Sequence, residues 1–366
     1  MARKPRCYHF RLMPVRSSLL CGALLCGALA STPVRLDTTD GSSKWSCATL
    51  STKPLSPNNS VSWTKLNCTG SFVNLIGQHE PVGPMVFNVV AAKLDAPGVA
   101  AVPMSAPQNA SVPADHRLQT VPAMAASASL PSSKKLLAGI NGGYFWRVDV
   151  SGTWIDNVCI GKSRKEAMKA ASAEDMGAGV GDSLLTIDGK VAASNCNCLG
   201  NSRPTALVLR EEADSSDDAA STAPAPVPRI EVLKRGGRLA GTVLDAIGSG
   251  PNLVTSGKMD IPGDNLNIIE HSANTAVAVR GGSELLLITS DGHDGCKRKD
   301  PTCGLSSRPM ATFLIEYLGV DSAMGMDQGG STTMWVNGEA GDGVVSNPGA
   351  GARQVFDGLF ISFDSA

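Results

Sequence analysis

The chain has 366 residues, of which 32 are Lys or Arg and 33 are Asp or Glu. This near-neutral balance supplies no clustered basic surface, so we expect no nucleic-acid partner. Hydrophobic residues make up 42% and charged residues 18%, which excludes a wholly disordered chain. The 39 glycines and 22 prolines, with only 4% aromatic residues, favour short strands and tight turns over a bundle of long helices.

Residues 1–30 have the layout of a secretory signal peptide. Basic residues without any acid precede an apolar stretch from Ser18 to Leu29, and small residues predict cleavage before Ser31. The apolar stretch is shorter than the roughly 20 residues that cross a bilayer; an uncleaved anchor is the alternative. We therefore expect a product that is secreted or remains in the secretory-pathway lumen, with no stable membrane span.

The cysteines that follow residue 30 are seven in number, and in an oxidising compartment we expect disulfides rather than metal sites. The Cys196-Asn197-Cys198 pair has no nearby His or second Cys pair, so we predict no metal and no cofactor. Asn-x-Ser/Thr triplets indicate glycosylation at Asn58, Asn67 and Asn109. The expected disulfide pairs, which leave one thiol over, are Cys47–Cys68, Cys296–Cys303, and Cys159 with either Cys196 or Cys198.

The first half of the chain contains few strong signals. Polar residues 31–80 predict an extended lead-in to one domain over residues 81–366. Residues 85–94 read as a buried strand, and a short apolar run over 136–140 ends at Asn141. Acidic and then Pro/Ala-rich residues 211–229 predict a disordered surface insertion.

The tetrapeptide at residues 181–184, GDSL, is the nucleophile block of a known esterase class. A serine nucleophile needs a histidine base, and no histidine here follows the Asp-x-x-His pattern of that class. We therefore interpret the segment as a hairpin that turns at Asp188-Gly189.

The last third of the chain is the best organised. The sequence predicts a hairpin over 275–289 and a helix that starts at Ser306 and ends at Gly319, with its apolar side chains on one face. Further strands are expected over residues 322–326, 333–336 and 355–363. Together these elements predict an α+β fold, a single mixed domain that is strand-rich with short helices and many Gly/Pro turns.

Three polar clusters follow apolar strands, at residues 141–145, 291–294 and 327–332. Paired glycines let backbone N–H groups approach a ligand because no Cβ atom blocks them. The Gly-Gly-Ser-Thr-Thr run adds hydroxyl donors, which suit phosphate oxygens or sugar hydroxyls. Each cluster alone is also typical of a simple turn, but carboxylates at two of the three favour a site.

These clusters resemble the phosphodiester glycosidase family. The motifs that carry the resemblance are NGGYF, the DG after LLLIT, MDQGGSTTMWVNG, GPNLVTSGK at 250–258 and ARQVFDGLFI at 352–361. The resemblance implies cleavage of a sugar–phosphate bond in a glycosyl-1-phosphodiester, so the expected partner is a carbohydrate phosphodiester. The sequence departs from the family pattern at two positions: Gln328 replaces a family glycine, and Asn274 replaces a family arginine. The candidate substitutes for that arginine are Arg203, Arg280 and Arg308.

The resemblance implies roles for individual residues. Asp327 is the expected catalytic carboxylate, and Asp291 is the second acid. His293 is either a proton shuttle or a loop residue, and Tyr144 or Phe145 either stacks on a sugar or packs in the core. Among the residues expected to bind substrate, Asn141 is expected to bond sugar hydroxyls, and the expected phosphate donors are Arg353, Ser331, Thr332 and the backbone of Gly329 and Gly330. Gly142, Gly143 and His293 complete the expected substrate-binding set.

Two other functions compete with this interpretation. One is a secreted, non-catalytic glycan- or cell-wall-binding protein on the same fold, which the departure at Asn274 favours and the intact Asp327 and Asp291 oppose. The other is a hydrolase that acts on a different polymer-linked or lipid-linked sugar phosphodiester.

Overall fold

The computed structural model describes residues 45–74, 77–106, 118–147, 179–181, 184–194, 205–210, 226–232, 239, 242–261, 271–292, 303–348 and 353–364. The expected signal peptide, the GDSL segment's Ser183, Asn109, Cys159, Cys196, Cys198 and Cys296 lie outside these residues.

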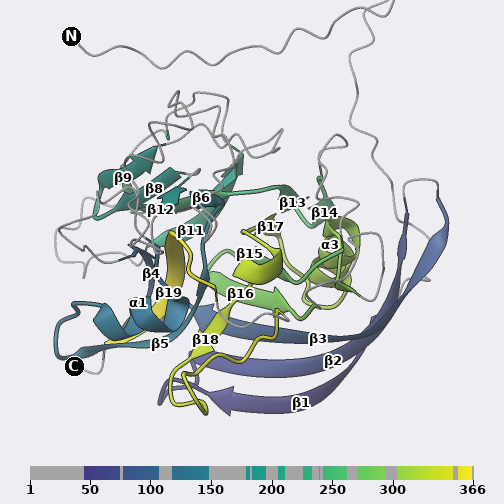
Figure 1. Ribbon diagram of the computed structural model, residues 1–366, viewed down its shortest axis with the longest axis horizontal. Helices are drawn as coiled ribbons and strands as arrows, with labels where there is room; N and C mark the ends of the chain where they lie inside the picture. Colours follow the sequence, from purple (N-terminus) through teal and green to yellow (C-terminus); the bar gives the residue numbers. More distant parts are fainter. Residues whose placement is uncertain are drawn as a thin grey trace, which may run out of the picture.

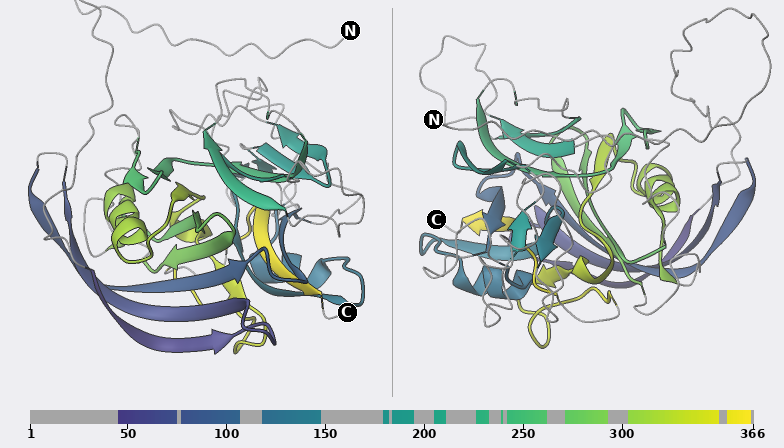
Figure 2. Two further views of the ribbon diagram at one scale, coloured as in Figure 1. Left: turned by 180° about the vertical axis from the view of Figure 1, so that it is seen from behind. Right: turned by 45° about the horizontal axis from the view of Figure 1, so that its top comes forward.

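Among the described residues, eight strands form the largest sheet, in the order β1-β2-β3-β16-β15-β17-β13-β14, with every neighbouring pair antiparallel. Figures 1 and 2 show β1, β2 and β3 as long strands that curve together along one side of the molecule. The strands are β1 (Ser46–Pro54), β2 (Val61–Val73), β3 (His79–Lys93), β13 (Asn252–Thr255), β14 (Lys258–Met259), β15 (Asn274–Arg280), β16 (Glu284–Ser290) and β17 (Ser322–Gly325).

Three smaller antiparallel sheets complete the described strands. A four-stranded sheet, β18-β5-β19-β4, contains β4 (Val99–Ser105), β5 (Lys134–Asn141), β18 (Met334–Val336) and β19 (Asp357–Asp364). A five-stranded sheet, β11-β10-β12-β8-β9, contains β8 (Leu184–Ile187), β9 (Lys190–Ser194), β10 (Thr205–Arg210), β11 (Val227–Val232) and β12 (Val243–Ser249). A two-stranded ribbon pairs β6 (Phe145–Arg147) with β7 (Gly179–Gly181).

The α-helices of the described residues are short. They are α1 (Val121–Ser127) and α3 (Ser307–Glu316), with a 3₁₀ turn, η4 (Gly329–Ser331), near the end of the chain. The expected strand-rich fold with short helices is therefore found. No helix in the described part of the chain is long and apolar enough to cross a membrane.

Two apolar cores lie on opposite faces of the large sheet. Leu285 and Leu287 of β16 contribute to the first core, whereas Leu286 and Ile288 contribute to the second, because successive side chains of a strand point to opposite faces. A strand that is buried on both faces needs a continuous apolar sequence, which residues 285–288 supply.

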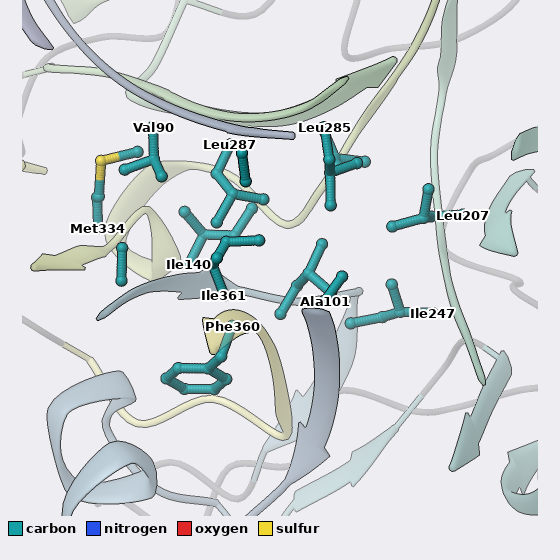
Figure 3. Packing of buried hydrophobic residues seen from close by; sticks show 14 of the residues in the cluster. Val90, Ala101, Ile140, Leu207, Ile247, Leu285, Leu287, Met334, Phe360 and Ile361 are labelled. Carbon is teal, nitrogen blue, oxygen red and sulfur yellow. The ribbon is translucent and has the colours of Figure 1, made fainter. Parts of the chain in front are cut away.

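The first core joins three sheets, as Figure 3 shows. Its members come from the large sheet (Val90, Leu285, Leu287), from the four-stranded sheet (Ala101, Ile140, Ile361) and from the five-stranded sheet (Leu207, Ile247). This shared packing fixes the end of β5 close to the strands of the large sheet, and the polar cluster at residue 141 follows directly.

Helix α3 covers the second core. Phe313 of α3 stacks on Phe87 of β3 with ring centroids 3.8 Å apart, and Trp45 meets Phe313 edge-on at 5.3 Å. The helix begins after Ser306, whose backbone is extended, and the chain turns away at Gly319 in the left-handed region (φ 64°). The expected start of this helix is therefore confirmed, whereas α3 ends at Glu316, before the expected stop at Gly319.

Several strands and turns expected from the sequence are also found. The hairpin of β15 and β16 turns at Gly281 and Gly282, and that of β8 and β9 turns at Asp188-Gly189, each residue with positive φ. The insertion expected over residues 211–229 does not extend to residue 229, because β11 begins at Val227 and pairs with β10. Residues 211–225 lie outside the described residues.

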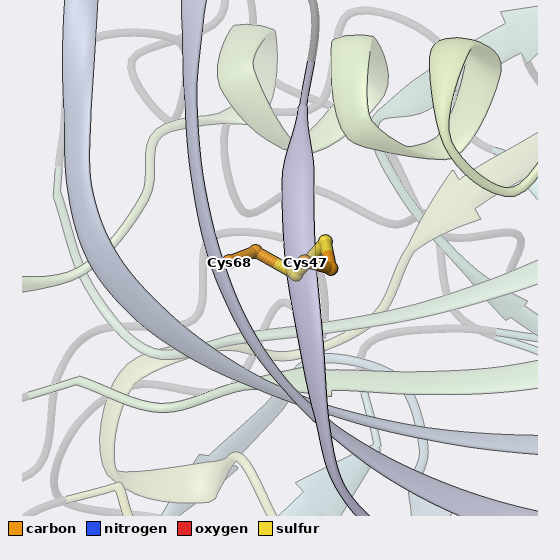
Figure 4. The surroundings of a disulfide bond; sticks show 2 residues. All are labelled: Cys47 and Cys68. Atoms are coloured by element: carbon orange, nitrogen blue, oxygen red, sulfur yellow. A yellow bond between two sulfur atoms is a disulfide. The ribbon is translucent and has the colours of Figure 1, made fainter.

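The first two strands belong to the large sheet, although residues 31–80 read as an extended lead-in. Cys47 and Cys68 lie opposite each other in the β1–β2 pair and form a disulfide, as shown in Figure 4. Strand β2 alternates buried and partly exposed side chains, with Val61 and Trp63 in the first core. That alternation is the sequence signal of a half-buried strand, which the Ser/Thr content of the segment obscures.

We predict that replacing both Cys47 and Cys68 with alanine lowers the free energy of unfolding by about 3 kcal/mol, because the unfolded chain loses a cross-link that restricts its freedom. The cross-linked positions are separated by 21 residues. Urea unfolding measures the loss, and wild-type protein treated with a reductant should show the same decrease. An unchanged midpoint in both samples would contradict the prediction.

Candidate functional site

The side chain of Asn141, at the end of β5, is the centre of a buried hydrogen-bond network. Its Nδ2 donates to the carbonyl of Asp327 at 2.8 Å. Its Oδ1 accepts from the Thr275 hydroxyl at 2.7 Å and from the N–H of Thr333 at 3.0 Å. The side chain is fully buried and engaged by protein atoms; its expected contact with sugar hydroxyls stays a prediction. Its role here is to hold β5, β15 and the 327–333 segment together.

Asp327 follows β17 and is held in place through its backbone and its carboxylate. Its N–H donates to the carbonyl of Gly142 at 3.0 Å, and its Oδ1 accepts from the N–H of Gln328 at 2.9 Å. The residue is 8% exposed, so the carboxylate is largely removed from water. A carboxylate in such a setting interacts strongly with neighbouring charges because little water screens them.

Arg353 brings a positive charge to Asp327. Its Nη2 lies 3.7 Å from Asp327 Oδ2 and also donates to the hydroxyl of Ser331. The guanidinium packs over the Phe145 ring at 5.7 Å, and one third of the Arg353 side chain remains exposed. The ion pair is longer than a direct hydrogen bond. The expected residues Asp327, Ser331 and Arg353 are therefore brought together.

The 3₁₀ turn η4 shapes the backbone beside this pair. Gly329 has φ +67°, in the left-handed region that glycine adopts without strain. The N–H of Thr332 closes the turn on the carbonyl of Gly329 at 3.0 Å. The Thr332 hydroxyl is buried and has no hydrogen-bond partner within the described structure.

Asp357, at the start of β19, is a site residue that the sequence analysis missed. Its Oδ1 accepts from the N–H of Gly143 at 2.8 Å, and its carbonyl accepts from the N–H of Gly142 at 2.8 Å. Gly142 in turn bonds the N–H of Asp327. The Gly142–Gly143 turn is therefore held between two aspartates. The available signal was a carboxylate that opens a largely apolar strand, four residues after Arg353.

The carboxyl of Asp357 titrates unusually. Burial raises the pKa of Asp357 from 3.8 to about 7, the N–H of Gly143 opposes this rise, and the Asp327 carboxylate adds to it. Desolvation and a like charge both disfavour the ionised form. The described site therefore contains one carboxyl group whose pKa lies close to neutral pH.

Of the remaining expected residues, Phe145 contacts this cluster through the guanidinium of Arg353, which packs over its ring. Asp291 follows β16, and its Oδ1 accepts from the N–H of Asn347 at 2.8 Å, which ties it to the segment after β18. His293 lies outside the described residues. Tyr144 and Phe145 are both buried, and Phe145 belongs to the first core.

Asn274 has a structural position. Its Nδ2 donates to the carbonyls of Ser272 and Leu305, at 2.8 Å and 2.6 Å. Among the arginines considered as substitutes, Arg280 pairs with Glu284 beside the β15–β16 turn, and Arg308 donates to the sulfur of Met259. Arg203 lies outside the described residues. Arg353 is therefore the arginine that the described structure places beside Asp327.

The described residues contain no cluster of three or more His, Cys, Asp or Glu side chains arranged to hold a metal ion. The chemistry available at the site consists of one carboxylate, one carboxyl with a raised pKa, one guanidinium, and hydroxyl and N–H donors.

We predict that Gly142→Ala destabilises the protein by about 1–3 kcal/mol, the usual cost of overpacking. A Cβ atom at this position would overlap Asp357 Oδ1 and lie 2.8 Å from the Ile247 side chain. Thermal unfolding measures the change. Gly83→Ala is the matched control, because a Cβ atom at Gly83 meets no heavy atom within 4 Å. Equal stability of the two variants would contradict the prediction.

We also predict that Asp357→Asn gains stability relative to wild type as the pH rises from about 4 to about 7. In that window the folded wild-type chain keeps the Asp357 proton while the unfolded chain has lost it, so wild-type stability falls with rising pH. Above pH 7 the difference should be constant. Urea unfolding at several pH values measures it, with Asp364→Asn on the same strand as the control. A difference that does not change with pH would refute the raised pKa.

Comparisons of sequence and structure relate this chain to known proteins. The model of a family described as phosphodiester glycosidase matches residues 183–362, just under half of the chain. The match includes Asp327, Arg353 and Asp357, whereas Asn141 precedes it. No curated protein matches the sequence.

Solved structures with 12–18% identity also resemble the chain. A Burkholderia pseudomallei protein described as exported is 13% identical, with a TM-score of 0.51 and coverage of 87% of this chain and 96% of that one. The catalytic domain of zebrafish N-acetylglucosamine-1-phosphodiester alpha-N-acetylglucosaminidase, auto-inhibited by its pro-peptide, is 18% identical, with a TM-score of 0.49 and 87% coverage of both chains. A hypothetical protein from Synechocystis is 12% identical, with a TM-score of 0.47; the match covers 83% of this chain and 62% of that one.

At 13% identity the likeness to the Burkholderia pseudomallei protein concerns the fold alone, and the sequence match is the finding that bears on family. The resemblance of this chain to the phosphodiester glycosidase family is therefore confirmed, by a match that spans residues 183–362.

Proposed function

We propose that this chain is a secreted hydrolase that cleaves the sugar–phosphate bond of a glycosyl-1-phosphodiester, such as an N-acetylglucosamine-1-phosphodiester. The observation that carries the proposal is the pairing of a largely buried carboxylate, Asp327, with the partly exposed guanidinium of Arg353 at 3.7 Å. This reaction needs a carboxylate next to the sugar and a cation next to the phosphate, with the two groups close to each other. The family match over both residues supports it.

The leaving group determines which catalytic groups are required. Cleavage of the sugar–oxygen bond of the diester releases a phosphate monoester as a stable anion, so strong protonation of the leaving oxygen matters less than in ordinary glycoside hydrolysis. The reaction then needs a carboxylate that activates water or stabilises positive charge on the sugar carbon. We assign this role to Asp327, whose position is set by the hydrogen bond of its N–H to Gly142.

The departing phosphate needs donors that strengthen as its charge develops. Arg353 supplies a guanidinium, and Ser331, which contacts it, supplies a hydroxyl. Thr332 offers a buried hydroxyl without a partner in the described structure, and the backbone of Gly329 and Gly330 completes the proposed phosphate side. These groups come from two segments that meet at Arg353.

Asp291 remains a proposed second acid that orients water or substrate. Its carboxylate contacts the N–H of Asn347, so its effect on the reaction would come through the loop between β18 and β19. His293 is proposed as a proton shuttle from the same polar cluster.

The proposal that the protein acts after export rests on two observations. Residues 1–30 have the pattern of a signal peptide. The Cys47–Cys68 disulfide belongs in an oxidising compartment. Glycosylation at Asn58 and Asn67 fits the same compartment, because both side-chain positions are exposed.

We predict that Asp327→Asn lowers the release of free sugar from a sugar-1-phosphodiester about a thousandfold, because the carboxylate that stabilises the transition state is lost. A panel of such diesters with different sugars and aglycones measures kcat/KM. Asp342→Asn, at an exposed aspartate, is the matched control and should keep wild-type turnover. Folding of both variants is checked by thermal unfolding. Undiminished turnover by folded Asp327→Asn would remove Asp327 from the mechanism.

A second candidate is a non-catalytic glycan-binding protein, which the position of Asn274 favours. Its amide is bonded to two backbone carbonyls, so no cation comes from the place where the family carries an arginine. The diester panel separates the candidates. Glycan binding without turnover of any diester would support the binding protein, whereas turnover that depends on Asp327 supports the hydrolase.

A further inference from the structure

In the described structure, the charged groups near Asp357 include more acids than cations. Its carboxyl is 3% exposed and interacts electrostatically with Asp327, which lies 3.7 Å from Arg353. The other described groups packed on Asp357 are uncharged: Gly142 and Gly143 present N–H groups, and Ser105 of β4 lies opposite in the sheet. One cation thus pairs with Asp327, and Asp357 is buried near that carboxylate without a cation of its own among the described contacts.

We propose that Asp357 is a positioning residue whose proton is coupled to the binding of an anion at Arg353. The inference rests on the proposed function only in taking that anion to be a phosphodiester. Asp357 does not contact the anion itself; it acts through the Gly142–Gly143 turn and through its charge.

The positioning role follows from the hydrogen bonds. Asp357 holds Gly143 through its carboxyl oxygen and Gly142 through its carbonyl, and Gly142 holds the N–H of Asp327. The neutral and the ionised carboxyl can both accept the N–H of Gly143. Loss of the proton therefore changes the charge of the site while this bond is kept.

The charge determines whether an anion is tolerated. With Asp357 neutral, Asp327 and Arg353 balance, and a singly charged phosphodiester adds one negative charge. With Asp357 ionised, the same anion would enter a site that already carries a net negative charge in a poorly screened interior. Binding of the anion therefore favours the protonated carboxyl, and by linkage protonation favours the anion.

The pH range follows from the burial of the carboxyl. Because the pKa of Asp357 is about 7, the affinity for an anion should be constant in mildly acidic solution and fall as the pH rises through 7. The decrease is at most tenfold per pH unit for one coupled proton.

The test uses the full chain and a phosphonate analogue of a glycosyl phosphodiester, which resists hydrolysis and carries one negative charge throughout the range. Calorimetry gives its Kd from pH 5.5 to 8.5. Wild type should bind several-fold more weakly at pH 8.5 than at pH 6 and take up a proton on binding near pH 7. Asp357→Asn, which keeps the acceptor for Gly143, should show neither effect, whereas Asp364→Asn should show both.

A constant wild-type Kd, an Asp357→Asn variant that keeps the pH dependence, or no anion binding at any pH would each overturn the proposal. Carbon NMR of wild-type aspartate carboxyls gives a second readout that needs no variant. One carboxyl should titrate near neutral pH, and the analogue should raise its pKa; an unmoved pKa would also overturn the coupling.

This outcome is separable from the hydrolase proposal. Proton-coupled binding of the analogue without turnover of any diester would retain the role of Asp357 and reject the hydrolase. Turnover of diesters with a Kd that is independent of pH would do the reverse.

Discussion

The buried amide of Asn141 is the interaction on which the geometry of the site depends. It joins three chain segments through hydrogen bonds to Asp327, Thr275 and Thr333. In a fully buried position each of these groups would otherwise lack a partner, which costs far more than an exposed hydrogen bond contributes. Because the amide oxygen and nitrogen are both used, the strand ends can meet in only one arrangement, and Asp327 is held where that arrangement requires.

The acids and the arginine of the site are placed by different means. Asp327 and Asp357 are attached through backbone hydrogen bonds to the Gly142–Gly143 turn, which is rigid and closely packed. Arg353 is attached through its side chain, to Ser331 and the Phe145 ring, and stays partly exposed. A fixed carboxylate beside a more accessible cation suits a ligand with one charged end and one neutral end. The charged end can approach from solvent, and the neutral end must take one orientation after binding.

The sequence was most informative where local chemistry determines structure. The apolar face of α3 and the Gly-containing turns of two hairpins act over a few residues, so they were predicted close to their observed limits. The roles of Asn141 and Asp357 were not, because they depend on partners 186 and 214 residues away. A motif shows that Asn141 precedes two glycines, but only the packing of three sheets shows that its amide faces inward. The strand character of residues 46–73 was hidden for a similar reason, since polar side chains on the exposed face outweighed the alternation.

The distance along the chain between those partners has a consequence for how the protein matures. The carboxyl of Asp357 and the Gly142–Gly143 turn meet only after loops of about two hundred residues have closed, and closing such loops is slow because their entropy is lost before the contacts form. The locally encoded hairpins can form early, whereas the site forms together with the β5–β19 and β3–β16 strand pairs, whose partners are equally distant in the chain. A newly made chain therefore acquires the capacity to engage a ligand only when these long-range strand pairs have formed.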